Sequence, residues 1–161
     1  MNILYVTSEA VPFCKTGGLA DVAGSLPQSL AANGDRVSVI LPLYQSVADA
    51  WRDRLHFERY TYVRLAWRSL YCGLFSYEWQ GVTWYFVDNE HYFCRGALYG
   101  EYDDGERFAF FCKAVIDLLP SLDWMPDILH CNDWQTALVP IYLKDVCTRW
   151  EAVRRIRTVF T

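Results

Sequence analysis

Hydrophobic and polar positions at the start of the chain predict a strand, a helix and a second strand. Residues 3–6 are apolar at every position, which is typical of a parallel strand buried on both faces. A helix is expected after Gly18, because apolar residues recur there at helical spacing, namely Leu19, Val22, Ala23, Leu26 and Leu30. This stripe keeps its phase across Pro27, so we expect one bent helix. Residues 36–41 then predict another buried strand, which Pro42 ends.

The middle of the chain has a different pattern. Three β-rich runs follow one another at residues 56–67, 70–79 and 82–88, with Gln80-Gly81 as a tight turn between the last two. They predict an antiparallel excursion from a parallel sheet. We interpret the many aromatic residues here mainly as packing, with an aromatic carbohydrate-binding platform as the alternative.

The second half returns to alternating helices and strands. Asp103-x-x-Glu106 resembles a capping box, and the helix after it has an apolar face made of Phe108, Phe111, Val115, Leu118 and Leu119. Residues 127–131 predict a strand, followed by a helix that Pro140 bends or interrupts, and residues 156–161 predict a last strand. The fold class is therefore α/β, a doubly wound, mostly parallel sheet with a β-hairpin excursion.

Composition narrows the class of protein further. The chain has 161 residues, 53% of them hydrophobic and 17% aromatic, which is enough for one domain with its own core. The net charge of −4 argues against a nucleic-acid or membrane-surface partner. No apolar run approaches the roughly 18 residues of a membrane span.

Cysteine usage indicates a reducing compartment. The six cysteines are far apart in the sequence and form no C-x-x-C pair: Cys14, Cys72, Cys94, Cys112, Cys131 and Cys147. Since no secretory signal is recognisable either, we expect six free thiols and a cytoplasmic protein.

The most informative stretch is residues 15–22, Lys-Thr-Gly-Gly-Leu-Ala-Asp-Val. A strand, a loop with paired glycines and a helix start form the usual phosphate-binding arrangement of α/β proteins. Gly17 and Gly18 let a ligand approach the backbone, Lys15 adds a positive charge, and Asp21 is placed to accept from a hydroxyl. The spacing fits neither a Walker A loop nor G-x-G-x-x-G. An ordinary glycine-containing turn with an incidental lysine is the alternative.

Three polar clusters follow strands of the predicted sheet, at residues 9–21, 88–104 and 130–134. Because ligands bind outside the carboxyl ends of parallel strands, these clusters predict one composite site. His91-x-x-Cys94 and the group around His130 lack the spacing of a zinc site, so no metal is expected. On residue statistics alone, His130 is more often a packing residue than a catalyst.

Several motifs together resemble the bacterial glycogen synthases and plant starch synthases. They are the stretch 15–22, Asp-Asn-Glu-x-Tyr-Phe at 88–93, Leu-Tyr-Gly at 98–100, Asp-x-Glu-Arg-Phe at 104–108 and Pro-Asp-Ile-Leu-His-Cys-Asn-Asp-Trp at 126–134. The resemblance implies transfer of glucose from ADP-glucose to the non-reducing end of an α-1,4-glucan, with retention and without a cofactor. It also implies the GT-B architecture, in which two Rossmann-like domains face each other across a cleft.

The resemblance also implies roles for individual residues. Lys15 and the amides of Gly17 and Gly18 are expected to face the donor diphosphate. Asp21 and Asp133 are expected to lie beside the reacting sugar as the catalytic candidates. The wall of the site is expected to include His130, Asn132, Trp134 and Tyr92. Family members vary at the position of Asn132, so an acid or base role is not expected there.

By the same resemblance, residues 1–161 correspond to a truncated N-terminal, acceptor-side domain, about the first third of a synthase. The family strand that matches residues 158–161 continues into Ile-His-Asn, and the C-terminal nucleotide-binding domain is absent, so we expect residues 1–161 alone to be inactive. Two alternatives remain: a non-catalytic module that binds a nucleotide or sugar phosphate, and a GT-B transferase that uses another sugar nucleotide.

Overall fold

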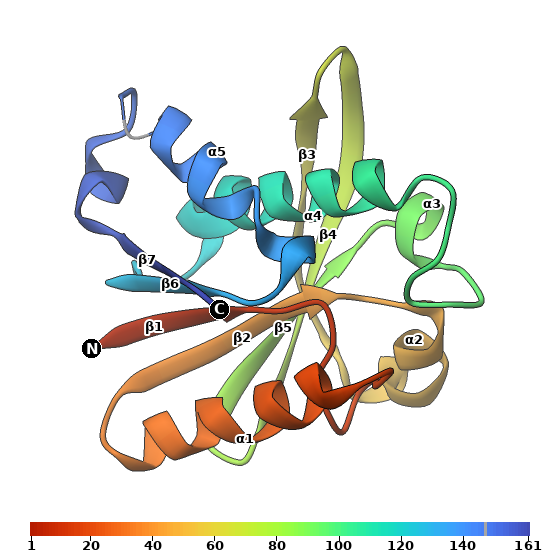
Figure 1. Ribbon diagram of the computed structural model, residues 1–161, viewed down its shortest axis with the longest axis horizontal. Coiled ribbons are helices and arrows are strands. Elements are labelled where there is room, and N and C mark those ends of the chain that lie inside the picture. Colours follow the sequence, from red (N-terminus) through yellow and green to blue (C-terminus); the bar gives the residue numbers. More distant parts are fainter. Residues whose placement is uncertain (147) are drawn as a thin grey trace.

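A seven-stranded sheet organises the computed structural model, which describes residues 1–146 and 148–161 (Figure 1). The strands lie in the order β3-β4-β5-β2-β1-β6-β7. Their bounds are β1 Asn2–Val6, β2 Arg36–Pro42, β3 His56–Leu65, β4 Arg68–Trp79, β5 Val82–Asp88, β6 Ile128–Cys131 and β7 Arg157–Phe160. From β5 to β7 all neighbours pair in parallel, whereas β3 and β4 pair antiparallel at one edge. The predicted doubly wound sheet with a hairpin excursion is confirmed.

Helices cover both faces of this sheet (Figure 1). Helix α1, Gly18–Ala32, lies on one face, and helices α4, Asp104–Leu118, and α5, Val139–Val146, lie together on the other. The shorter helices α2, Gln45–Trp51, and α3, Glu90–Phe93, lie near the carboxyl ends of β2 and β5. The described residues also form four short 3-10 helices: η1 Arg52–Arg54, η2 Leu119–Ser121, η3 Trp134–Thr136 and η4 Glu151–Arg155.

The core is built around the central strands and includes buried residues of α4 as well as of α1 and α2. Strands β1 and β2 are buried along almost their whole length, as expected for parallel strands covered on both faces. Every residue of the predicted apolar face of α4 is buried. Strand β5 pairs antiparallel with β4 and parallel with β2, so it joins the hairpin to the parallel sheet.

Helix α1 buries a different face from the one we predicted. It is a single helix through Pro27, as expected, but its buried residues are Ala20, Ala23, Gly24 and Pro27. Val22 is 50% exposed. The reason is close approach: a Cβ on Gly24 would lie 2.7 Å from the carbonyl oxygen of Val11, so only small residues fit there. The close approach of the loop at Val11 therefore decides which face of α1 is buried, and that face carries small side chains instead of the larger apolar ones.

Two local predictions near α4 and α5 need correction. Asp103 makes no side-chain cap, because its carboxylate accepts two hydrogen bonds from Arg95, at 2.6 and 2.7 Å. The chain after β6 forms the 3-10 turn η3 first, and Pro140 lies in the first turn of α5, where the missing N–H costs least. The predicted turn at Gln80-Gly81 is present, with both residues at positive φ.

Two further expectations concern the cysteines and the helices. Cys14, Cys72, Cys94, Cys112 and Cys131 are free thiols, and all but Cys94 are buried. The prediction for Cys147 lies outside the described residues. Within residues 1–146 and 148–161, none of the helices has the length and apolar character that a membrane span needs.

Candidate functional site

The strand order places two polar loops side by side. The chain leaves β1 towards α1 and β2, on one side, and leaves β6 towards α5 and β7, on the other, although β1 and β6 are neighbours. Such a reversal is the topological switch point at which doubly wound sheets bind ligands. The loop after β1 holds Lys15, and the loop after β6 holds Asp133.

The first loop presents a cation at a helix start. Lys15 Nζ lies 2.7 Å from both carboxylate oxygens of Asp21, and both side chains are about half exposed. Gly17 is the N-cap of α1 and offers no capping side chain. A Cβ on Gly18 would meet nothing within 4 Å, so the space before the helix is open. The unpaired first amides and Lys15 together make a place suited to a phosphate.

A buried carboxylate that our sequence analysis did not single out holds this loop in place. Glu9 is only 2% exposed, and its Oε2 accepts hydrogen bonds from the backbone amide of Thr16 and from Thr16 Oγ1, the latter at 2.8 Å. Thr7 Oγ1 donates to the backbone oxygen of Glu9 at 2.9 Å. An acidic residue just past a buried strand was the available sequence signal, since it needs partners there.

The second loop turns sharply at Asp133. This residue has φ +64°, a backbone conformation that residues other than glycine rarely adopt. Its Oδ1 accepts from the backbone amide of Trp134 at 2.6 Å, and its own amide donates to the carbonyl of Thr161 at 2.8 Å. Asp133 and Trp134 are both exposed, so their side chains face outward from the ends of β6 and β7.

Two other predicted wall residues tie strands together. Asn132 is buried, donates through Nδ2 to the carbonyl oxygens of Val6 and His130, each at 3.0 Å, and accepts from Thr161 Oγ1 at 2.9 Å. Its amide is thus used in cross-linking β1, β6 and β7. His130 packs edge-on against Tyr5, with ring centroids 4.8 Å apart, and burial lowers its pKa. The imidazole of His130 is therefore neutral near pH 7.

The 88–104 segment joins the two loops. Ser8 Oγ and the hydroxyl of Tyr99 are 2.7 Å apart, and the ring of Tyr99 lies 6.4 Å from that of Trp134. Phe108 of α4 supports Trp134 from 5.2 Å. Ser8 and Tyr99 were not among our candidates; the Leu-Tyr-Gly motif contained the signal. The predicted convergence of three loops is thus present through Ser8, Tyr99 and Trp134.

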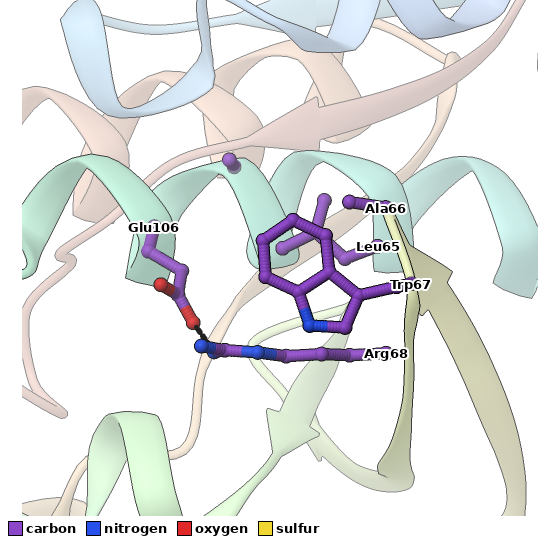
Figure 2. Close-up of a pocket in the computed structure, with 6 residues that line it drawn as sticks. Leu65, Ala66, Trp67, Arg68 and Glu106 are labelled. Atoms are coloured by element: carbon purple, nitrogen blue, oxygen red, sulfur yellow. Dashed lines mark hydrogen bonds and ion pairs between the residues drawn. The ribbon is translucent and has the colours of Figure 1, made fainter.

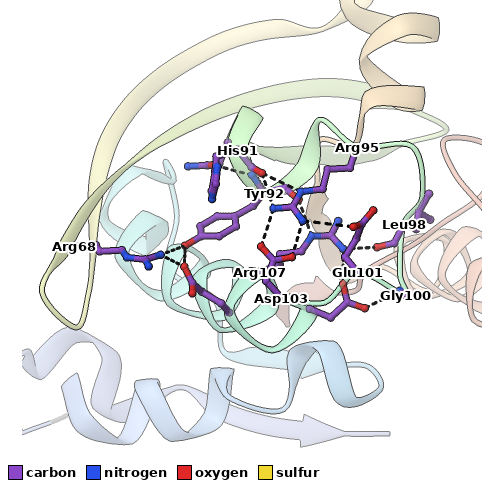
Figure 3. A network of polar contacts seen from close by, with 12 residues as sticks. Arg68, His91, Tyr92, Arg95, Leu98, Gly100, Glu101, Asp103 and Arg107 are labelled. Carbon is purple, nitrogen blue, oxygen red and sulfur yellow. Dashed lines mark hydrogen bonds and ion pairs between the residues drawn. The ribbon is translucent and has the colours of Figure 1, made fainter.

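Tyr92 is the one predicted wall residue that the structure places elsewhere. It is fully buried, and its hydroxyl contacts Glu106 and lies 3.5 Å from Arg68 (Figure 3). A side chain without exposed surface offers nothing to a substrate, so the expectation for Tyr92 is corrected. Arg68 also pairs with Glu106 beside Trp67, where a hollow of about 190 Å³ separates the hairpin tip from α4 (Figure 2). Tyr92 therefore helps to fasten the hairpin to α4.

The loop after α3 is fixed by a buried arginine. Arg107 donates to the carbonyl of Tyr92 at 2.7 Å and to that of Leu98 at 3.2 Å, and it pairs with Asp104 at 2.6 Å (Figure 3). Asp104 in turn accepts from the amide of Gly100 at 2.7 Å. These bonds flank Tyr99 on both sides, so Arg107 sets the path of the segment that carries it.

Fold and site together define a doubly wound α/β domain whose polar loops meet at the switch point of its sheet, the place where such sheets bind ligands. A lysine and open helix amides lie on one side, and the exposed carboxylate of Asp133 lies on the other. Among residues 1–146 and 148–161, no group of three or more acidic, histidine or cysteine side chains is arranged to hold a metal.

Comparison with known proteins identifies the family. Residues 2–161 match the model of the starch synthase catalytic domain, and the chain belongs to this family. It is 53% identical to a glycogen synthase of Clostridium botulinum (strain Alaska E43 / Type E3) over 144 residues, which are 89% of this chain and 30% of the relative. It is 48% identical to a glycogen synthase of Anoxybacillus flavithermus over all 161 residues, 33% of that protein.

A solved structure supports the same assignment. The catalytic domain of starch synthase IV from Arabidopsis thaliana, solved bound to ADP and acarbose, is 31% identical with a TM-score of 0.86, over 98% of this chain and 33% of the other. The predicted resemblance to glycogen and starch synthases is confirmed. The chain spans about a third of the length of the curated relatives it matches.

Proposed function

We propose that this domain forms one wall of a retaining glucosyltransferase that moves glucose from ADP-glucose to the non-reducing end of an α-1,4-glucan. The observation that carries the proposal is the exposed Lys15 beside the uncapped start of α1, at the switch point of the sheet. Charge develops on the departing phosphate as the glycosidic bond breaks, and a lysine with free amides stabilises that charge.

Further support comes from the similar proteins. The two relatives above are named glycogen synthases, and the similar solved domain was bound to ADP. We assign Asp21 and Asp133 to the sugar and acceptor hydroxyls, and Trp134 and His130 to the wall. Asn132 supports that wall from within the sheet.

The proposal extends to the rest of the enzyme and its setting. We place the nucleotide pocket on a second Rossmann-like domain opposite this one, as in the GT-B architecture. The buried free thiols favour a reducing, cytoplasmic setting.

A donor comparison tests the proposal. An enzyme in which residues 1–161 are joined to a complete second domain is assayed for glucose transfer to glycogen from ADP-glucose and from UDP-glucose. Transfer that prefers ADP-glucose supports the proposal. Preference for UDP-glucose favours another GT-B transferase, and ligand binding without any transfer favours a non-catalytic module.

A further inference from the structure

Arg68 lies at the tip of the β3–β4 hairpin and contacts residues of both α3 and α4. Its guanidinium pairs with Glu106 in the first turn of α4 (Figure 2). It also lies 3.5 Å from the hydroxyl of Tyr92 in α3 (Figure 3). The same oxygen of Glu106, Oε1, accepts a hydrogen bond from the hydroxyl of Tyr92. The hairpin, α3 and α4 therefore meet at one carboxylate, outside the loops around Lys15 and Asp133.

The segment between α3 and α4 is closed by its own hydrogen bonds. Arg95 donates to the carbonyl of His91, at 2.9 and 3.1 Å, and to the carboxylate of Asp103, at 2.6 and 2.7 Å. Together with the bonds of Arg107 described above, these contacts join the two ends of the segment. A segment closed in this way moves as one unit, so a displacement at its start is transmitted to Tyr99.

Tyr99 connects this segment to the candidate site. Its hydroxyl lies 2.7 Å from Ser8 Oγ, and its ring centroid lies 6.4 Å from that of Trp134. Ser8 belongs to the loop after β1, and Trp134 to the loop after β6. Direct contacts therefore lead from Arg68 through Tyr92 to the segment that carries Tyr99.

The exposure of the ion pair indicates that it acts on position more than on stability. The side chains of Arg68 and Glu106 are 42% and 37% exposed, and ion pairs so open to water contribute little to the free energy of unfolding. Tyr92, in contrast, is fully buried, and burial raises its pKa to about 12, so its hydroxyl keeps its proton and donates to Glu106. Without Arg68, the carboxylate of Glu106 is free to turn towards water. A buried hydroxyl without an acceptor is costly, so Tyr92 would then move to regain one.

We propose that Arg68 is a positioning residue: through Tyr92 it determines where Tyr99 lies in the candidate site. Arg68 touches no substrate in this role and acts only by holding the segment between α3 and α4. The proposal rests on the transfer function proposed above, which supplies the reason that the position of Tyr99 matters. The effect of the hairpin on Tyr99 can nevertheless be measured without transfer.

¹H–¹⁵N NMR of the 161-residue chain measures this effect in the absence of substrate. Arg68→Ala should shift the amide signals of Tyr99 and Gly100 and the indole N–H signal of Trp134, whereas the urea midpoint of unfolding should fall only slightly. Tyr92→Phe removes only the hydroxyl and should shift the same three signals. Urea unfolding of each variant verifies that it is folded.

Two further variants serve as controls. Arg68→Lys should leave the three signals close to their parent positions, because Arg68 contacts Glu106 through the single nitrogen Nη1 and a lysine can replace a contact of this kind. Arg64→Ala should also leave them unchanged. Arg64 is exposed on β3, so its substitution removes the same charge from the same hairpin without touching Glu106 or Tyr92.

Kinetics of the enzyme with a complete second domain test the consequence. Arg68→Ala should lower kcat/KM for glucose transfer about tenfold, as expected for a small displacement of a site residue. Arg68→Lys should restore most of this loss, and Arg64→Ala should show none.

Three results overturn the proposal: unshifted signals of Tyr99 and Trp134 in Arg68→Ala, equal shifts in Arg64→Ala, or unchanged transfer by Arg68→Ala. An inactive parent enzyme has a different meaning. In that case the proposed transfer function fails, while the NMR shifts still decide whether Arg68 positions Tyr99.

Discussion

Two carboxylates near the start of α1 have opposite environments and therefore different roles. Glu9 is buried and bonded to Thr16, so it shapes the loop and is not free to meet a ligand. Asp21 is half exposed and bonded to Lys15, so it is available at the surface. A donor phosphate would compete with Asp21 for Lys15. On binding of the donor, Lys15 would therefore exchange its ion pair with Asp21 for one with the phosphate.

We predict that Lys15→Ala lowers glucose transfer in an enzyme containing this domain. A partly exposed charge pair with phosphate contributes about 1–4 kcal/mol, so the expected loss of kcat/KM is about tenfold to a thousandfold. Initial rates at sub-saturating ADP-glucose measure it. Lys113→Ala is the matched control, since Lys113 is also paired with a carboxylate, Asp117, but lies on α4. Equal kinetics for the two variants would remove Lys15 from the site.

A second prediction concerns Glu9 as a positioning residue. Glu9→Gln and Thr16→Val should each raise the donor KM more than they lower kcat, because each loosens the loop that presents Lys15. Hydrogen bonds to charged groups contribute about 1.5–3 kcal/mol, so effects of about tenfold or more are expected. In a double-mutant cycle the second substitution should add little. Fully additive effects would show that the two side chains act independently.

At the scale of elements, small residues determine how α1 meets the rest of the domain. The Val11 amide donates to the carbonyl of Ala20 at 3.1 Å, so the loop after β1 runs along the helix. Gly24 permits this contact, because the loop lies directly over its Cα. The helix and the Lys15 loop are therefore one packed unit.

Gly24→Ala should destabilise the fold by about 1–3 kcal/mol, the usual cost of overpacking. The new Cβ would lie 2.3 Å from Val11 Cγ2 and would push the loop away from the helix. Gly105→Ala is the control, because a Cβ there meets nothing within 4 Å and alanine favours a helix. Urea unfolding measures both. A Gly24→Ala protein as stable as Gly105→Ala would contradict the packing account.

At the scale of the whole molecule, buried titratable groups limit the pH range of stability. Burial raises the pKa of the thiols of Cys72 and Cys112 from 9 to about 12, with the same effect at Cys14 and Cys131. These thiols keep their protons in the folded state while the unfolded chain loses them, so stability is present below pH 9 and is lost as pH rises towards 12. Burial lowers the pKa of His130, so its contribution is lost as pH falls below 6.5.

We therefore predict maximal stability between about pH 6.5 and 9, measured as the urea midpoint across pH. Cys72→Ala should flatten the alkaline decline, although it lowers stability overall through a cavity. Cys94→Ala is the control, because Cys94 is exposed and should leave the decline unchanged. Identical alkaline slopes for Cys72→Ala and the parent would rule out the buried thiol as a cause.

The final prediction is that a polypeptide limited to residues 1–161 folds but transfers no glucose. Its sheet and core are well packed, whereas the Lys15 loop faces solvent, where salt screens its attraction to phosphate. Positioning of donor and acceptor between two domains lowers the activation free energy by several kcal/mol, and a single domain cannot provide this positioning. A radiolabelled-glucose assay beside the longer enzyme measures the difference. Turnover within about tenfold of the longer enzyme would show that a second domain is dispensable.

The sequence by itself determined the elements with uniform local patterns. Residues 3–6 are apolar throughout, residues 37–41 are apolar except for Ser38, and apolar residues recur at helical spacing along α4. The burial of these segments therefore follows from their own side chains. The family motifs also occur in order along the chain, and they indicated Lys15, Gly17 and Asp133 as candidate site residues from the sequence alone. Local signals suffice where a segment's own side chains decide its burial.

Only the tertiary structure decided which polar groups meet. Ser8 and Tyr99 are 91 positions apart, and Asn132 reaches a carbonyl 126 positions away, so their pairing depends on strand order. The same reason explains why Tyr92 is buried: its hydroxyl contacts Glu106 of α4 and lies near Arg68 at the start of β4, and the sequence shows neither contact. Apolar burial is a property of a residue and its neighbours, whereas a buried polar atom needs a particular partner that only the assembled sheet provides.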